Sequence, residues 1–136
     1  MAGSTVGQAW KKIIVTTEGA PAPRSAASAQ GVRVGPLLFV TGQSGREPGE
    51  AGYKANPVEH ARRTMENVKA VVEAGGSTMA DVVKRTVIVR DQEIFAAVRD
   101  VIESYFPTPV ASTTLRGALM LPDMLLEVEV VAVVPE

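Results

Sequence analysis

The sequence predicts an α+β domain in which two helices cover one face of a mixed sheet. Apolar, β-branched segments of strand length recur along the chain. Between them lie two longer stretches whose apolar residues repeat at three- and four-residue spacing, the pattern of a helix with one buried side. The predicted order is β-β-β-α-β-α-β-β. A length of 136 residues suits one domain, so we expect a single domain over 1–136 with residues 1–10 as a loose leader.

Three strands are predicted before the first helix, over residues 11–17, 32–34 and 37–43. The last two are separated by Gly-Pro, a turn signal, and should form a hairpin. The segments 18–31 and 44–57 are rich in small, polar or glycine residues and show no periodicity. We expect both to be irregular loops.

The first helix is predicted to begin at Pro57, with Asn56 as its N-cap, and to end at Gly75–Gly76. Its apolar stripe consists of Val58, Ala61, Met65, Val68 and Val72. The second amphipathic pattern covers 92–106 and is stopped by Pro107.

Further strands are predicted over 81–90, 111–120 and 125–134. In the last of these, Glu127 and Glu129 are two residues apart and therefore lie on one face. The opposite face is wholly apolar and suits packing under the helices. The carboxylates should then lie on the face that the helices leave bare. That face is still half apolar, so it is expected to be a subunit interface.

Composition narrows the possible functions. The net charge is −1 and the pI about 5.9, with no basic stripe, so no nucleic-acid partner is indicated. The absence of cysteine excludes disulfides and thiol catalysis and fits a reducing cytoplasm. The start of the chain lacks the apolar stretch of a signal peptide, and no apolar run reaches membrane-helix length. We expect a soluble cytoplasmic protein.

Common chemical motifs are missing. The stretch GQSG lacks the Lys-Ser/Thr of a phosphate-binding loop. The lone histidine, His60, lies among charged residues and is predicted to occupy a solvated helix face. Without cysteine or a second histidine, a metal site is not expected.

One strand carries a possible polar patch. Ser112, Thr114 and Arg116 are evenly spaced and should share a face, and we expect them to join Glu127 and Glu129 on the bare side of the sheet. Arg116 then has two interpretations. It either forms a salt bridge with one of the glutamates across a subunit interface, or it holds an anionic ligand.

Nearly the whole chain, from KKIIVTT to the C-terminus, resembles the RidA (YjgF) family. The resemblance rests on the segments AQGVRVGPLLFVTGQ, TMENVKAVVEAGGSTMADVVKRTVIVRD, FAAVRDVIESYF and LLEVEVVAVV and on their spacing. It implies a chorismate-mutase-like fold and a homotrimer with ligand clefts between subunits. Archetypal members hydrolyse reactive enamines and imines, such as 2-aminoacrylate, to 2-keto acids and ammonia without a cofactor. In them an arginine holds the substrate carboxylate and a glutamate on the last strand activates or positions water.

The resemblance carries over to this chain only in part. The family glutamate falls on Glu127, and the backbone turn that lines the cleft falls on Thr41 and Gly42, with Gln43 following. The position of the family tyrosine falls on Ser28.

The family arginine has no counterpart. Its position falls on Ser112 or, with a shift of one residue, on Thr113. The chain therefore resembles divergent members that lack this arginine. Arg116, Arg24 or Arg46 could compensate for its loss.

Three functions remain open from the sequence. The chain is a trimeric hydrolase of imines or enamines, or a non-catalytic trimer that binds a small molecule or a partner, or a specialised pathway deaminase of the 2-aminomuconate type. Family members have also been called endoribonucleases, but this chain has neither a basic patch nor paired histidines.

Overall fold

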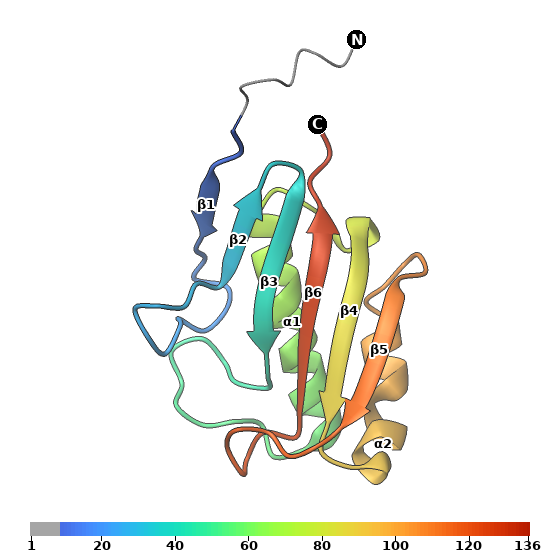
Figure 1. Ribbon diagram of the computed structural model, residues 1–136. Helices are drawn as coiled ribbons and strands as arrows, with labels where there is room; N and C mark the ends of the chain where they lie inside the picture. Colours follow the sequence, from blue (N-terminus) through green and yellow to red (C-terminus); the bar gives the residue numbers. More distant parts are fainter. Residues whose placement is uncertain (1–8) are drawn as a thin grey trace.

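The computed structural model describes residues 9–136 and shows one mixed sheet with two helices behind it (Figure 1). The elements are β1 (Lys12–Val15), β2 (Gly31–Val34), β3 (Leu37–Gln43), α1 (Pro57–Ala74), the short 3₁₀ helix η2 (Met79–Asp81), β4 (Val82–Val89), α2 (Gln92–Glu103), β5 (Ala111–Arg116) and β6 (Leu126–Val133). The strand order is β1-β2-β3-β6-β4-β5, so the last strand lies in the middle of the sheet.

The sheet is mixed because β5 runs parallel to β4, whereas the other neighbours are antiparallel. The connection between the two parallel strands is α2, as a parallel crossover requires. A shift of register interrupts the β3–β6 pairing between Val40 and Gln43, which is the segment that contains Thr41 and Gly42. The bulge therefore lies opposite the segment of β6 between Val128 and Val130.

Both helices lie on the same side of the sheet (Figure 1). Helix α1 packs on β3 and β6, and α2 packs on α1 and β4. At the start of α1, the Asn56 side chain accepts a hydrogen bond from the Glu59 amide and Pro57 takes the first turn, as predicted. The core includes Leu38, Met65, Val68, Val72, Val87, Val98, Leu126 and Val128. The predicted α+β fold with two helices on one face is confirmed.

Two element ends differ from the prediction by three or more residues. Helix α2 ends at Glu103 rather than 106, because the next two amides, of Tyr105 and Phe106, bond to carbonyls three residues back instead of four. The Tyr105 hydroxyl donates to Glu66 of α1, at 2.6 Å. Strand β5 ends at Arg116 rather than 120. The Gly117 amide makes the last bond, to the Val89 carbonyl, where β4 itself ends.

Two further predictions concern the whole chain. Most of the predicted leader, residues 1–10, lies outside the described residues. Among the residues that the structure describes, no helix combines the length and the apolar character needed to cross a membrane.

Candidate active site beside an open sheet face

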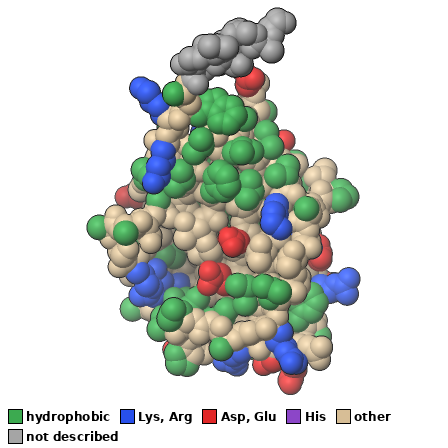
Figure 2. Space-filling model, viewed as in Figure 1, with side chains coloured by type: hydrophobic (Ala, Val, Ile, Leu, Met, Phe, Trp, Pro, Cys, Tyr) green, Lys and Arg blue, Asp and Glu red, His purple; other side chains and the backbone are tan. Residues whose placement is uncertain are grey.

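Glu127 and Glu129 project from the middle of the sheet face that the helices leave open. Along β6, the residues facing the helices are buried, whereas Glu127 is partly buried and Glu129 is exposed. The pairing with β4 sets Glu127 opposite Ile88 and Glu129 opposite Thr86. Figure 2 shows acidic side chains at the centre of this face, with hydrophobic side chains above and below them. The predicted orientation of the two carboxylates is therefore correct.

Glu127 is seated against the backbone of Gly42 in β3. A Cβ atom at position 42 would overlap the Glu127 carboxyl group, lying 2.8 Å from its carboxyl carbon. Burial raises the pKa of Glu127, and the neighbouring Glu129 carboxylate raises it further. A glutamate with a raised pKa is a stronger base than an exposed one.

A cavity of about 380 Å³ opens beside Gly42 and the Glu127 carboxyl group. Three residues predicted from the family resemblance, Ser28, Thr41 and Gly42, line it together. Arg24 and Arg46, named as possible replacements for the family arginine, line it as well. The other lining residues are Pro21, Ala22, Pro23, Ala29, Gln30, Gln43, Ser44, Tyr53, Met120, Leu121 and Met124. Gly42 belongs to this wall and also supports Glu127, so the carboxyl group adjoins the cavity.

Tyr53 supplies an aromatic wall that the sequence did not reveal. Its hydroxyl accepts a hydrogen bond from Arg24, at 3.0 Å, and its ring lies under the same guanidinium. Tyr53 comes from the glycine-rich loop 44–57, which has no periodic pattern to indicate where its side chains point. The only available signal was an isolated aromatic residue in a polar loop.

The predicted polar patch on the open face is wrong for three of its members. Ser112 pairs with Arg85 of β4, whose guanidinium bonds both the Ser112 hydroxyl, at 2.9 Å, and Glu103 of α2, at 2.8 Å. Ser112 is therefore on the helix side of the sheet. Thr114 and Arg116 share that side by alternation, and they line a separate cavity with residues of α2.

Among the predicted site residues of this strand, Thr113 is the one that faces the open side. It pairs with Thr86, which in turn pairs with Glu129. Of the two positions considered for the missing family arginine, the register places Thr113, and not Ser112, on the same face as Glu127.

The prediction for His60 is also wrong, because the ring is fully buried rather than solvated. Its Nδ1–H donates to the Lys54 carbonyl, at 2.8 Å, and Nε2 accepts from the Gly45 amide, at 3.1 Å. The Ser44 hydroxyl lies 2.9 Å from Nε2 and also donates to the Leu126 carbonyl, at 2.6 Å. Burial lowers the pKa of His60, which keeps the ring neutral.

This network joins the cavity to the start of β6. Ser44 lines the cavity, and its hydroxyl holds the residue that precedes Glu127. His60 therefore has a structural role that positions Ser44 and the catalytic candidate. The sequence could not reveal this role, because the partners come from a loop and from a strand 65 or more residues away along the chain.

No group of three or more His, Cys, Asp or Glu side chains within residues 9–136 is arranged to hold a metal ion. The sequence-based expectation that no cofactor is used stays a prediction.

The described geometry agrees with a known protein family. The family model described as Endoribonuclease L-PSP matches residues 17–134. The chain belongs to the RidA (YjgF) family. A RutC family protein of Haemophilus influenzae is 38% identical over 125 residues, covering 88% of this chain and 95% of the relative. The 2-iminobutanoate/2-iminopropanoate deaminase of Escherichia coli K12 is 36% identical over 123 residues, with coverage of 88% and 95%.

Solved RidA-family structures have the same fold. The YjgF gene product of Escherichia coli superposes with a TM-score of 0.82 at 34% identity, covering 89% of this chain and 98% of that one. The structure of Escherichia coli TdcF with bound serine gives a TM-score of 0.83 at 32% identity, with coverage of 89% and 98%.

Proposed function

We propose that this protein is a cofactor-free deaminase that hydrolyses a small carboxylate-bearing imine or enamine. The observation that carries the proposal is the position of the Glu127 side chain. The carboxyl group is half-buried, has a raised pKa and is supported by Gly42 beside a cavity of metabolite size. A relative with 36% identity bears the name of an imine deaminase.

The proposed reaction needs one positioned base. Glu127 takes a proton from water as the water oxygen bonds to the imine carbon. Protonated Glu127 returns this proton to the nitrogen, which gives a carbinolamine. Glu127 then moves the hydroxyl proton to the amino group, which leaves as ammonia while the C–O bond becomes a carbonyl, so the imine and water become a keto acid and ammonia. The raised pKa brings the basicity of Glu127 closer to what proton abstraction near neutral pH requires.

We infer that the site is completed by other copies of the chain in a homotrimer. The open face exposes large apolar side chains, a feature typical of interaction surfaces. Phe39, Leu115 and Ile14 are 45%, 51% and 55% exposed. A partner subunit on this face would exclude water around Glu127 and close the cavity into an intersubunit cleft. Gel filtration with light scattering tests the trimer directly.

A deamination assay tests the catalytic proposal. An imino acid such as 2-aminoacrylate is generated in situ by a helper enzyme, and its half-life and the release of ammonia are followed with and without the protein. Glu127→Gln should lower the rate by at least about a hundredfold while leaving the oligomer intact. Arg116→Ala should keep the wild-type rate, because Arg116 lies on the helix side of the sheet. Full activity of Glu127→Gln would refute the catalytic role.

A non-catalytic binding trimer is the second candidate. The observation that favours it is Thr113, which occupies the open face where the family arginine would clamp a carboxylate. It predicts ligand binding without acceleration of imine hydrolysis in the same assay. An endoribonuclease role has less physical support, because the single histidine is buried with both ring nitrogens hydrogen-bonded.

A further inference from the structure

The wall of the cavity includes two arginines that have no ion-pair partner among the described residues. Arg24 and Arg46 both line it, and neither forms a salt bridge within residues 9–136. None of the described residues that line the cavity is acidic. Unpaired guanidinium groups at the edge of an apolar pocket favour a ligand with an acidic group.

Both guanidinium groups are positioned by neutral partners. Arg24 donates to the Tyr53 hydroxyl, at 3.0 Å, and lies over the Tyr53 ring, at 6.0 Å from its centroid. Arg46 donates from Nη1 to the Glu50 carbonyl, at 3.0 Å. Arg46 and Tyr53 also form an antiparallel β-bridge, so a single loop presents Arg46 and the aromatic support of Arg24. The remaining N–H donors of each group are available to a ligand.

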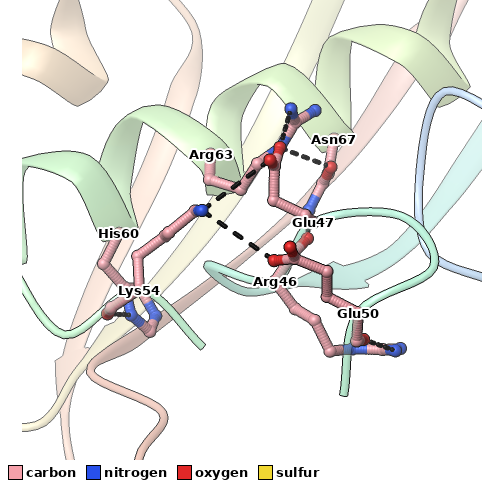
Figure 3. Close-up of polar contacts among 7 residues, drawn as sticks. All are labelled: Arg46, Glu47, Glu50, Lys54, His60, Arg63 and Asn67. Atoms are coloured by element: carbon pink, nitrogen blue, oxygen red, sulfur yellow. Dashed lines mark hydrogen bonds and ion pairs between the residues drawn. The ribbon is translucent and has the colours of Figure 1, made fainter. Parts of the chain in front are cut away.

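The loop that presents Arg46 is fixed to helix α1 (Figure 3). Fully buried Asn67 donates from its amide to the Arg46 carbonyl, at 2.8 Å, and to the Ser44 carbonyl, at 3.1 Å. Arg63 of the same helix pairs with Glu47, at 2.7 Å. The backbone of Arg46 is therefore held by contacts to helix α1, and the residue borders a solvent-accessible cavity.

We propose that Arg24 and Arg46 bind an acidic group of the ligand that is remote from the reacting carbon. This inference rests on the proposed function, since it takes the reacting carbon to lie at Glu127. The Glu127 carboxyl group is next to Gly42, which lines the cavity, but Glu127 is not itself a lining residue. A ligand that reaches from Glu127 to the arginines must span the cavity, whose Met120, Leu121 and Met124 side chains suit an aliphatic chain. The substrate class is then the imines or enamines of dicarboxylic acids.

Binding of two stable 2-keto acids tests the inference on the full-length protein. The probes are 2-oxoglutarate and 2-oxopentanoate, which have the same number of carbons and differ in the terminal carboxylate. In isothermal titration calorimetry, wild type should bind 2-oxoglutarate at least about tenfold more tightly, as expected for charge-assisted contacts. Equal affinity for the two acids would overturn the proposal.

Variants that each remove one arginine charge test which residues cause the preference for 2-oxoglutarate. Arg24→Gln and Arg46→Gln should each lower the preference about threefold or more, and the double variant should abolish it. Arg116→Gln removes the same charge in a different cavity and should keep the wild-type preference. A preference that survives in the double variant, or that is lost in Arg116→Gln, would overturn the assignment.

The binding assay is independent of catalysis, so the two proposals fail separately. If Glu127→Gln has full deaminase activity but the arginines still select 2-oxoglutarate, the catalytic role fails and the acidic subsite stands. If Glu127 proves essential but the two keto acids bind equally, the deaminase stands and the acidic subsite fails.

Discussion

The Glu127 carboxyl group occupies the space that a side chain at position 42 would need. A Cβ at Gly42 would lie 2.8 Å from the carboxyl carbon and 3.0 Å from Cγ of Glu127. The backbone at Gly42 does not have a positive φ angle, so glycine is not required there by backbone conformation. The requirement comes from the room that the carboxyl group takes.

Replacing Gly42 by alanine should therefore separate activity from stability. The methyl group would displace the end of a flexible side chain, which costs little, and we expect the free energy of unfolding to fall by about 1 kcal/mol or less. The displaced carboxyl group would no longer face its water, so deamination should slow at least about tenfold. Urea unfolding and the imine assay measure the two effects.

Gly52→Ala is the matched control for Gly42→Ala. A Cβ at position 52 would meet no atom within 4 Å, so this variant should keep both activity and stability. A fully active Gly42→Ala protein would show that the position of the Glu127 carboxyl group does not limit the reaction.

Glu129 should tune the pH dependence of the reaction. Its carboxylate raises the pKa of Glu127, in addition to the larger effect of burial. If ionised Glu127 is the base, kcat/KM rises with pH through this pKa. Glu129→Gln removes the repulsion, lowers the Glu127 pKa and should move the acid limb of the profile to lower pH. Glu73→Gln, which removes a charge from the end of α1, should leave the limb in place. If the acid limb of the kcat/KM profile does not move in Glu129→Gln, a group other than Glu127 produces that limb.

His60 should destabilise the fold in mild acid. Its pKa is lowered from 6.5 by burial, so the unfolded chain binds a proton more readily than the folded one. The stability that neutral His60 contributes is complete above about pH 6.5 and decreases as the pH falls from there towards the folded-state pKa. Glu127 acts in the opposite direction, because its pKa is raised in the fold.

The single histidine allows a direct measurement of this effect. One imidazole resonance should titrate by NMR below pH 6.5 in the folded protein and near 6.5 in urea. A folded-state value at or above 6.5 would contradict the buried neutral ring. The pKa values of Glu47 and Glu103 are lowered in the fold, so these groups affect stability only below about pH 4.5. They therefore do not obscure the effect of His60 just below pH 6.5.

The fold was predictable because local patterns and packing agree. The spacing of Val58, Met65 and Val72 places one apolar stripe on α1. The alternation along β6 places Glu127 and Glu129 on the sheet face that points away from the helices. Element ends were less predictable. Strand β5 stops where β4 ends, and the sequence of β5 alone carries no sign of its partner's length.

The site was only partly predictable, because register and loop contacts are long-range. Even spacing showed that Ser112, Thr114 and Arg116 share a face, but not which face. That choice depends on the pairing of Ser112 with Arg85 and on the bond from Arg85 to Glu103. The burial of His60 likewise depends on a loop that folds back over the helix.

The register yields a gain-of-function prediction at position 113. Thr113 is exposed on the open face, level with Thr86 and Glu129, so Thr113→Arg introduces a guanidinium on the side of Glu127. We expect KM for a carboxylate-bearing imine to fall at least about tenfold, since arginine binds carboxylates through two hydrogen bonds.

Ser112→Arg provides the comparison that makes the test specific. On the helix side, a new arginine would compete with Arg85 for Glu103 and place two positive charges together. This variant should lose about 1–3 kcal/mol of unfolding free energy and gain no affinity. If Ser112→Arg lowered KM and Thr113→Arg did not, the β4–β5 register would be wrong. Because the two positions are adjacent in sequence, only their opposite faces can account for different outcomes.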